Sequence, residues 1–328
     1  MRGPRPLPLF LELLRDAAID DPAVGRAALD GLRRYQSAPP PPSRRERPVV
    51  QDMAGVTLRD CGGSGPTVIL VPSLINPPTI LDLDPDCSLA DALAARHRVL
   101  LLDWGPAAAR HLLSLDGHVD ERLVPLVEAA GPAILAGYCL GGTLALAAAA
   151  RTSAVRAVAT LASPYDFGAY EGSARKGLLA LWRASETAAG RLGFLPMEVL
   201  QAAFWQIDPA RIVAKFARFA TADLGSSQAR RFVALEDWAN SGEPLPLPAA
   251  RQLVEELYGN AGVIAPLPAC PMLHVTATGD RIVPAATAPT GERLSSPSGH
   301  VGMIVGRDAA TSLHAPLLRW LEGVARSR

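Results

Sequence analysis

Cys139 is the residue whose surroundings most clearly favour chemistry. It lies in the run Gly-Tyr-Cys-Leu-Gly-Gly at residues 137–142, after an apolar stretch at 132–136 and before a helix-forming stretch at 143–147. The glycines allow a sharp strand–turn–helix connection that holds a nucleophile in a strained backbone conformation. The N-terminus of the following helix also favours a thiolate. We therefore predict a nucleophilic cysteine; the alternative is a buried structural cysteine beside a tight turn.

Two further residues of suitable type follow along the chain. Asp280 comes just after a predicted buried strand at 272–277, and His300 follows a short strand candidate at 292–295. A carboxylate at a strand end can orient an imidazole, which can then accept the proton of a thiol. The order nucleophile, acid, histidine is that of the α/β-hydrolase triad. The expected catalytic residues are therefore Cys139, Asp280 and His300.

This triad also requires hydrogen-bond donors for the negative charge that develops on the substrate oxygen. The backbone N–H of Leu140, directly after the nucleophile, is one expected donor. The second should come from the loop that follows the apolar run ending at Val71, and Leu74 is the residue we expect there. Leu140 and Leu74 together form the predicted oxyanion hole.

The remaining pattern predicts the elements that position these residues. Buried strands are predicted at 67–71, 98–103, 132–136, 155–161 and 272–277. They alternate with helical patterns, which indicates a mostly parallel sheet with helices on both faces. A glycine cluster at 62–65 separates strand-like runs at 56–60 and 67–71 and predicts a hairpin-like turn. The expected fold class is α/β, an α/β-hydrolase fold with a helical cap insertion.

Changes in the sequence pattern divide the chain into three expected parts. Residues 1–48 should form an N-terminal helical arm that ends in a proline-rich linker, with Asp20 and Asp21 capping its second helix. Residues 49–165 and 266–328 should form the hydrolase core. The strand–helix alternation stops between them, so residues 166–265 should form a helical cap over the active site.

Composition excludes several other classes of protein. The 328 residues carry 32 basic and 32 acidic side chains, and this balance favours neither nucleic acid nor an anionic membrane as a partner. No apolar run has the length of a membrane span, and the N-terminus does not read as a signal peptide. The four cysteines show no metal-ligand spacing and no disulfide pattern. We therefore expect a cytoplasmic protein without a metal or a cofactor.

Several stretches together resemble the poly(3-hydroxyalkanoate) synthase family. The family's Gly-x-Cys-x-Gly-Gly box is matched at residues 137–142, and a more specific block is matched at 71–89, where Ile-Leu-Asp-Leu and Ser-Leu occur. The segments at 103–106, 280–284 and 298–302 complete the match, which extends from about residue 49 to residue 306. The residue after the matched aspartate is Arg281, where the family usually has histidine.

This resemblance implies an acyltransferase that uses coenzyme A thioesters of 3-hydroxy acids. Cys139 would carry the acyl group as a thioester, His300 would move the proton, and Asp280 would orient the imidazole. The length of the chain is similar to that of the short catalytic subunits that act with a partner, so a second synthase subunit or a homodimer is implied. A place at the surface of polyester granules is implied as well.

Two other functions fit the same residues. A cysteine-dependent hydrolase is the first alternative, either a thioesterase or esterase on this scaffold or a relative of dienelactone hydrolases, which resemble the chain at the Gly-Tyr-Cys-Leu-Gly-Gly run. The second alternative is a relative that has lost its catalytic activity and acts as a granule-surface or interaction subunit. The complete set of three triad residues argues against the second alternative, since a binding module does not need them.

Overall fold

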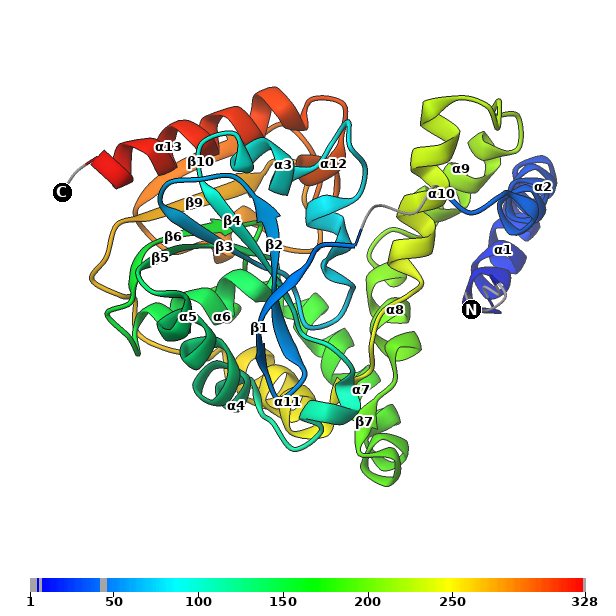
Figure 1. The fold of residues 1–328 in the computed structure, drawn as a ribbon. Helices are drawn as coiled ribbons and strands as arrows, with labels where there is room; N and C mark the ends of the chain where they lie inside the picture. The colour runs from blue at the N-terminus through cyan, green and yellow to red at the C-terminus, as the bar shows by residue number, and fades with distance from the viewer. Residues whose placement is uncertain (1–4, 6–7, 42–45, 327–328) are drawn as a thin grey trace. The chain divides into compact units, whose positions relative to one another are not determined.

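The computed structural model describes Arg5 and residues 8–41 and 46–326. The chain divides into two compact units. Residues Arg45–Met197 and Glu243–Arg328 form the larger one, which we call the sheet unit; Met1–Arg44 and Glu198–Gly242 form the smaller, which we call the helical unit. Each is described by itself (Figure 1).

An eight-stranded sheet forms the centre of the sheet unit, with the strand order β1-β2-β4-β3-β5-β6-β9-β10. The strands are β1 (Val49–Met53), β2 (Val56–Gly62), β3 (Thr67–Val71), β4 (Arg98–Asp103), β5 (Ala133–Tyr138), β6 (Val155–Leu161), β9 (Met272–Ala277) and β10 (Glu292–Ser296). All pairs from β4 to β10 are parallel, whereas β1 and β2 add to the edge in antiparallel pairing. The expected α/β-hydrolase fold with a mostly parallel sheet is confirmed.

One local expectation is wrong. The glycine cluster at 62–65 does not close a hairpin between β2 and β3, because β4 lies between these two strands and pairs with both. The hairpin instead joins β1 to β2 through Ala54 and Gly55, which both have positive φ angles. A glycine-rich segment predicts a turn of the chain, but it does not predict which strands pair on either side of the turn, because that depends on the whole sheet.

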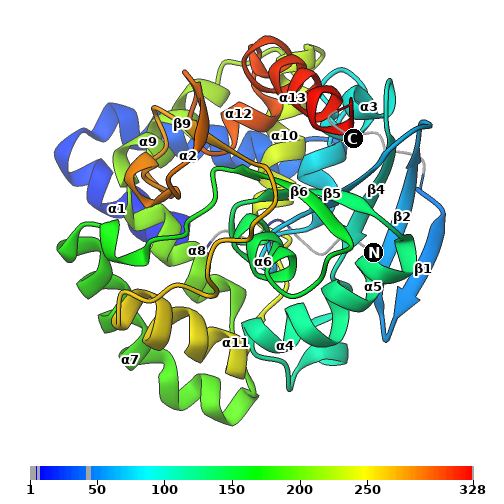
Figure 2. The ribbon, with the colours of Figure 1, turned by 90° about the vertical axis from the view of Figure 1, so that its left-hand side faces the viewer.

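Helices cover both faces of the sheet, as Figures 1 and 2 show. One face carries α3 (Leu89–Ala94) and α13 (Ala315–Arg326), and the other carries α4 (Leu115–His118), α5 (Val124–Ala130) and α6 (Leu140–Ala149). The central strands are buried on both faces, and every residue of β5 is buried. Strands covered on both sides are apolar throughout, which is the pattern of the predicted runs.

A helical insertion occupies the chain between β6 and β9. Its parts in the sheet unit are η4 (Phe167–Ala169), α7 (Gly172–Leu192), the short strands β7 (Phe194–Leu195) and β8 (Leu245–Pro246), α11 (Leu247–Arg251) and η5 (Gln252–Gly259). The segment η5 is a π-helix that continues α11. The remaining short elements of the sheet unit are η1 (Pro78–Asp82), η2 (Ala107–Arg110), η3 (Val119–Leu123), η6 (Ala285–Thr287), α12 (Gly302–Val305) and η7 (Ala310–His314).

The helical unit joins the N-terminal helices to the middle of that insertion. It contains α1 (Pro8–Asp20), α2 (Pro22–Ser37), α9 (Pro209–Phe219), α10 (Ser227–Ala239) and most of α8 (Met197–Gln206). Its core includes Tyr35, Trp205 and Phe216. Asp21 caps α2 by accepting the N–H groups of Ala23 and Val24, as the sequence predicted.

The two units divide the chain differently from the three expected parts. Residues 198–242, expected in the cap, form a common apolar core with the N-terminal helices, which were expected to be a separate arm. The proline-rich linker lies partly outside the described residues, at 42–45. In the described part of the chain, no helix combines the length and the apolar character that crossing a membrane requires.

Candidate active site

Cys139 occupies the sharp turn between β5 and α6. Its backbone has φ 55° and ψ −132°, a conformation that costs an L-residue about 1–3 kcal/mol. The N–H of Cys139 donates to the carbonyl of Leu161 at the end of β6, 2.9 Å away. The side chain is half-buried at the N-terminus of α6. The predicted strand–turn–helix connection is therefore present, with the sulfur at the carboxyl edge of the sheet.

Two glycines of the run allow α6 to begin this close to the sheet. A Cβ added at Gly141 would lie 2.2 Å from the carbonyl oxygen of Val71, and one at Gly142 would lie 2.0 Å from Oγ of Ser163. Both distances are far below contact, so only glycine fits at these positions. The close approach brings the first turn of α6 against the loop after β3, where Leu74 lies.

Asp280 and His300 meet at the ends of β9 and β10. The imidazole Nδ1 of His300 is 2.7 Å from Oδ2 of Asp280. The other carboxylate oxygen accepts the backbone N–H groups of Ile282 and Val283 at 2.8 and 2.9 Å, which fixes the orientation of the acid. Both side chains are buried, with Asp280 8% and His300 9% exposed. This arrangement leaves Nε2 of His300 as the nitrogen that is not occupied by the carboxylate.

The charges of the site favour a protonated His300. Burial by itself lowers the pKa of the imidazole, but the charge of Cys139, hydrogen bonds to Asp280 and Cys139, and the charge of Asp280 outweigh it. The result is a pKa raised to about 10. The interactions around the imidazole therefore stabilise the imidazolium form of His300.

Tyr138 supports this pair and was not singled out by the sequence analysis. Its ring lies 5.0 Å from the imidazole of His300, with 32° between the planes, and its hydroxyl donates to the carbonyl of His300 at 3.4 Å. Tyr138 is 2% exposed, so it fills the space beneath the imidazole. Its position inside the Gly-Tyr-Cys run was the one signal available in the sequence.

The loop after β3, which contains Leu74, is held from several directions. The indole Nε1 of Trp104 donates to the carbonyl of Pro72 at 2.9 Å, and the N–H of Glu243 donates to the carbonyl of Ile75 at 3.0 Å. Leu74 itself is buried. Leu140 is the first residue of α6, where backbone N–H groups have no partner within the helix. The expected pair of oxyanion donors thus lies on two segments that Gly141 brings into contact.

The second sequence block, at 71–89, has a structural part that the sequence did not reveal. Asp82 accepts two hydrogen bonds from the guanidinium of Arg47, at 2.9 and 3.1 Å, and one from the hydroxyl of Ser88 at 2.6 Å. Asp82 is 6% exposed. We call Arg47, Asp82 and Ser88 the Asp82 cluster. It anchors η1 and the start of α3, since Ser88 also caps α3 by accepting the N–H of Asp91.

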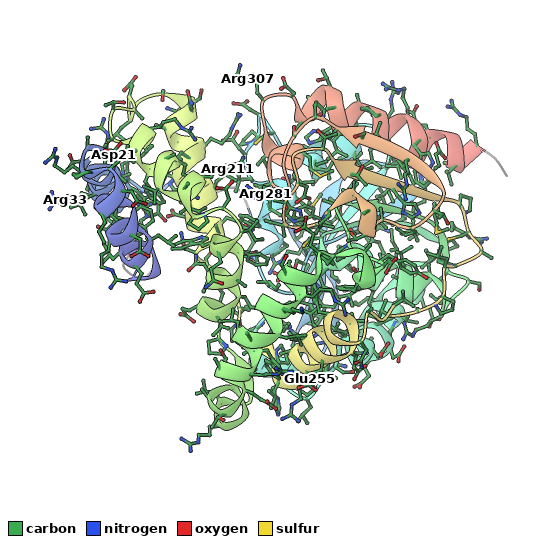
Figure 3. The ribbon with its side chains drawn as sticks, turned by 180° about the vertical axis from the view of Figure 1, so that it is seen from behind. Asp21, Arg33, Arg211, Glu255, Arg281 and Arg307 are labelled. Atoms are coloured by element: carbon green, nitrogen blue, oxygen red, sulfur yellow. The ribbon has the colours of Figure 1, made fainter. Side chains whose placement is uncertain are left out.

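Arg281, which directly follows Asp280, has an exposed side chain and is labelled in Figure 3. No group of three or more histidine, cysteine or acidic side chains among the described residues could hold a metal ion. The other buried histidines are His118, His274 and His314, which lie within helices or strands, and His97, which lies in the turn before β4. His274 in β9 shares a hydrogen bond with the hydroxyl of Thr160 at 2.9 Å.

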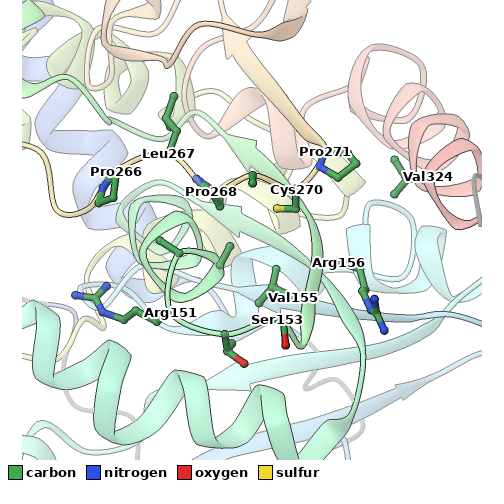
Figure 4. A pocket seen from close by; sticks show the side chains of 14 residues that line it. Arg151, Ser153, Val155, Arg156, Pro266, Leu267, Pro268, Cys270, Pro271 and Val324 are labelled. Carbon is green, nitrogen blue, oxygen red and sulfur yellow. The ribbon is translucent and has the colours of Figure 1, made fainter.

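A pocket of about 740 Å³ lies at the other edge of the sheet (Figure 4). It is lined by residues 149–153, 155 and 156 from the end of α6 to the start of β6, by 266–271 before β9, and by Val324. Arg151, on its rim, forms ion pairs with Asp116 and Asp120. The pocket therefore lies at the amino ends of β6 and β9, whereas Cys139 and Asp280 follow the carboxyl ends of β5 and β9, so the pocket is separate from the candidate site.

The fold and this arrangement agree with the comparison with known families. The model of the α/β hydrolase family matches residues 68–327, a range that contains most of the sheet unit and also residues 198–242 of the helical unit. The chain therefore belongs to the α/β hydrolase family. A membrane phospholipase A of known structure superimposes with a TM-score of 0.51 at 17% identity, over 97% of this chain and 93% of that one, which shows the fold alone.

Within this family, the chain is similar to subunits named poly(3-hydroxyalkanoate) polymerase. The subunit from Thiocystis violacea is 25% identical over 77% of this chain and 80% of its own length. The subunit from Haloferax mediterranei is 28% identical over 58% of this chain, which spans less than half (41%) of that relative. The resemblance to the synthase family is confirmed. The chain is an enzyme, either an acyltransferase or a related hydrolase.

Proposed function

We propose that the chain transfers 3-hydroxyacyl units from coenzyme A thioesters to a hydroxyl group through an acyl-Cys139 intermediate. The observation that carries the proposal is the hydrogen-bonded pair of Asp280 and His300, 2.7 Å apart, together with Cys139 held at a positive φ beside it. The similarity to polymerase subunits supplies the substrate class.

In the first half of the reaction, the thiolate of Cys139 attacks the carbonyl carbon of the thioester. The carbonyl oxygen becomes an oxyanion, and the N–H groups of Leu140 and Leu74 would stabilise it. The carbon–sulfur bond to coenzyme A then breaks, and the leaving sulfur takes the proton of the His300 imidazolium. The products are free coenzyme A, an acyl-cysteine and a neutral imidazole.

In the second half, the neutral His300 accepts the proton of the incoming hydroxyl group. The hydroxyl oxygen attacks the acyl-cysteine carbonyl, an ester bond forms, and the thiolate of Cys139 leaves beside the new imidazolium. Asp280 stabilises that cation and keeps the imidazole in one orientation. If water replaces the hydroxyl group, the same steps release a free acid, so the two outcomes differ only in the acceptor.

No metal or cofactor takes part in these steps. We place the reaction in the cytoplasm, with the surface of a polyester granule as a further site. A second synthase subunit or a second copy of the chain is the partner implied by the similarity to polymerase subunits.

The test uses the purified protein with 3-hydroxybutyryl-coenzyme A. Thiol release is followed over time and the products are analysed by mass, for the wild type, for Cys139→Ala, and for Cys270→Ala as the matched cysteine control at the remote pocket. The proposal predicts growing oligoesters in the wild type and in Cys270→Ala, and no release in Cys139→Ala. Free hydroxy acid as the only product would make the protein a thioesterase.

A further inference from the structure

Three aromatic side chains of the helical insertion form one cluster inside the sheet unit. Phe167 lies on η4, Tyr170 directly follows it, and Tyr258 lies on η5. The ring of Tyr258 is 4.8 Å from that of Phe167 at 83° and 5.0 Å from that of Tyr170 at 54°. We call these residues the tyrosine cluster. Phe167 is fully buried, so it forms the apolar floor against which both tyrosines pack.

The hydroxyl of Tyr170 lacks a satisfying partner in this environment. Tyr170 is 8% exposed, and its hydroxyl oxygen is buried without a hydrogen bond of normal geometry among the described residues. A buried polar group left in this state costs roughly 1–3 kcal/mol, which a ligand that supplies a hydrogen-bond partner would offset. The nearest hydroxyl group in the cluster is that of Tyr258.

Backbone contacts connect this cluster to the turn that holds Cys139. The chain reaches Tyr170 directly from the end of β6, where Leu161 accepts the N–H of Cys139. Two residues beyond Ala162, the carbonyl of Pro164 accepts the hydroxyl of Thr143 in α6, at 2.6 Å. The N–H groups of residues 165 and 166 then donate to the carbonyl of Thr287, the last residue of η6, which follows Asp280 in the chain.

The pKa shifts of Tyr170 and Tyr258 agree with a position of the tyrosine cluster close to Cys139. Burial is the main cause that raises the pKa of Tyr170, with contributions from Tyr258 and from the charges of Cys139 and Asp280. Burial also raises the pKa of Tyr258 to about 12; the neighbouring hydroxyl of Tyr170 opposes this rise, and the charge of Cys139 adds to it. Both phenols therefore remain protonated and able to donate near the nucleophile.

The insertion holds Tyr258 in place. Arg175 of α7 donates through Nε to the carbonyl of Tyr258 at 2.7 Å and through Nη2 to the carbonyl of Gly259 at 2.9 Å. Glu255, labelled in Figure 3, accepts the indole N–H of Trp182 at 2.8 Å. The helix that carries Tyr258 is wound as a π-helix, a form often found at functional sites.

We infer that Tyr170, with Tyr258 beside it, is a specificity-determining residue that donates a hydrogen bond to the hydroxyl group of a hydroxyacyl chain delivered to Cys139. The inference rests on the proposed function for the site it serves. A substrate hydroxyl would satisfy the buried Tyr170 hydroxyl, whereas an unsubstituted acyl chain would leave it unpaired. A site built in this way rejects the analogue that lacks the hydroxyl, because its own polar group then remains buried without a partner.

The experiment compares two substrates in the first half-reaction alone. Single-turnover release of coenzyme A is measured with 3-hydroxybutyryl-coenzyme A and with butyryl-coenzyme A, and the ratio of the two kcat/KM values is the readout. The variants are Tyr170→Phe and Tyr258→Phe. Tyr165→Phe is the matched control, because its hydroxyl donates to the carbonyl of Ala265 at 3.2 Å and has a partner already.

We expect the wild type to prefer the hydroxylated substrate, and Tyr170→Phe to reduce that ratio about 10- to 100-fold, the loss expected of one buried hydrogen bond. The loss falls on the hydroxylated substrate, while butyryl-coenzyme A is used at the wild-type rate or faster. Tyr258→Phe should give a smaller change in the same direction, and Tyr165→Phe none. Equal loss for both substrates, or an unchanged ratio in Tyr170→Phe, would overturn the inference.

Failure of this inference differs from failure of the proposed function. Acylation of Cys139 precedes the choice between water and a hydroxyl group as acceptor. If Tyr170→Phe lowers the ratio of the two kcat/KM values but free acid is the only product, the acyltransferase proposal alone is overturned. Oligoester formation with no ratio effect overturns the role of Tyr170 alone. If neither thioester acylates Cys139, the proposed function fails, and the ratio is read with p-nitrophenyl 3-hydroxybutyrate and p-nitrophenyl butyrate.

Discussion

Asp82 and Asp280 are both buried aspartates of the sheet unit, 6% and 8% exposed, and each binds a nitrogen-bearing side chain. The partner of Asp82 is Arg47, whose guanidinium binds both carboxylate oxygens. The partner of Asp280 is His300, bound through one oxygen while backbone N–H groups occupy the other. In both pairs the two carboxylate oxygens accept hydrogen bonds, but the chemistry of the partner side chains differs.

The difference lies in what the partner can do. The hydrogen bond to Asp82 is the largest of the causes that raise the pKa of Arg47, so this guanidinium keeps its proton and the Asp82 cluster is closed. An imidazole can exchange its proton, and His300 has a second ring nitrogen directed away from Asp280. A buried ion pair therefore becomes a candidate for catalysis only when one member titrates and faces a reactive atom.

Replacing Cys139 should have the largest effect on activity. Cys139→Ala removes the proposed nucleophile, and we expect loss of thiol release by at least about a thousandfold. The folding stability of a second variant, Cys139→Gly, should exceed that of Cys139→Ala, because glycine adopts the positive φ at this residue without strain. Thermal unfolding of both variants measures the second effect, and a Cys139→Gly protein that melts below Cys139→Ala would contradict it.

Matched amide substitutions separate the two aspartates. Asp280→Asn keeps the shape but no longer holds the imidazolium, so kcat should fall about 10³- to 10⁴-fold. Asp82→Asn should leave kcat within about twofold but lower the free energy of unfolding by about 1–2 kcal/mol, because the partly buried Arg47 loses one of its two carboxylate partners and keeps only Asp91. Thioester turnover and urea unfolding, measured on both, check this. Loss of turnover in a fully folded Asp82→Asn protein would remove the distinction.

The pH dependence of turnover should distinguish the two sites as well. Thiol release from a thioester needs the imidazolium as proton donor, so it should persist up to the raised pKa of His300, about 10, and decline above it. Asp280 is one of the groups that raise this pKa, so in Asp280→Asn the decline should begin at lower pH. The profile of Asp82→Asn should coincide with that of the wild type. A basic limb that stays in place in Asp280→Asn would contradict the assigned role.

Ser88→Ala should have the smallest effect. The variant loses the hydrogen bond to Asp82 and the cap of α3, which together should cost about 1–2 kcal/mol of folding stability. Turnover should not change, since Ser88 belongs to the closed cluster. Urea unfolding followed by circular dichroism checks the first expectation, and thiol release checks the second.

The sequence predicted those parts of the molecule that depend on local patterns. The turn at Cys139 could be predicted because a buried strand, glycines and a helix follow one another within a short stretch of chain. Asp280 and His300 could be predicted because each follows a strand of the same parallel sheet. The hairpin expected before β3 was wrong, because β4 pairs between β2 and β3, and this pairing joins segments that are distant in the sequence.

Other features depend on contacts between distant segments. Arg47 was assigned to the linker that ends at residue 48, and only the folded chain brings it to Asp82. Tyr170 and Tyr258 are 88 positions apart, and no spacing rule pairs them. The packing of residues 198–242 with the N-terminal helices is a third case, because amphipathic helices do not specify their partners.

The most direct test of the central claim is mass analysis of the enzyme itself during turnover. The wild type, Asp82→Asn and Asp280→Asn are mixed with 3-hydroxybutyryl-coenzyme A, quenched within the first turnover, digested and mapped. The account predicts an acyl group on the peptide that contains Cys139 in the wild type and in Asp82→Asn, and almost none in Asp280→Asn. An acyl group on another residue, or equal labelling of all three proteins, would contradict it.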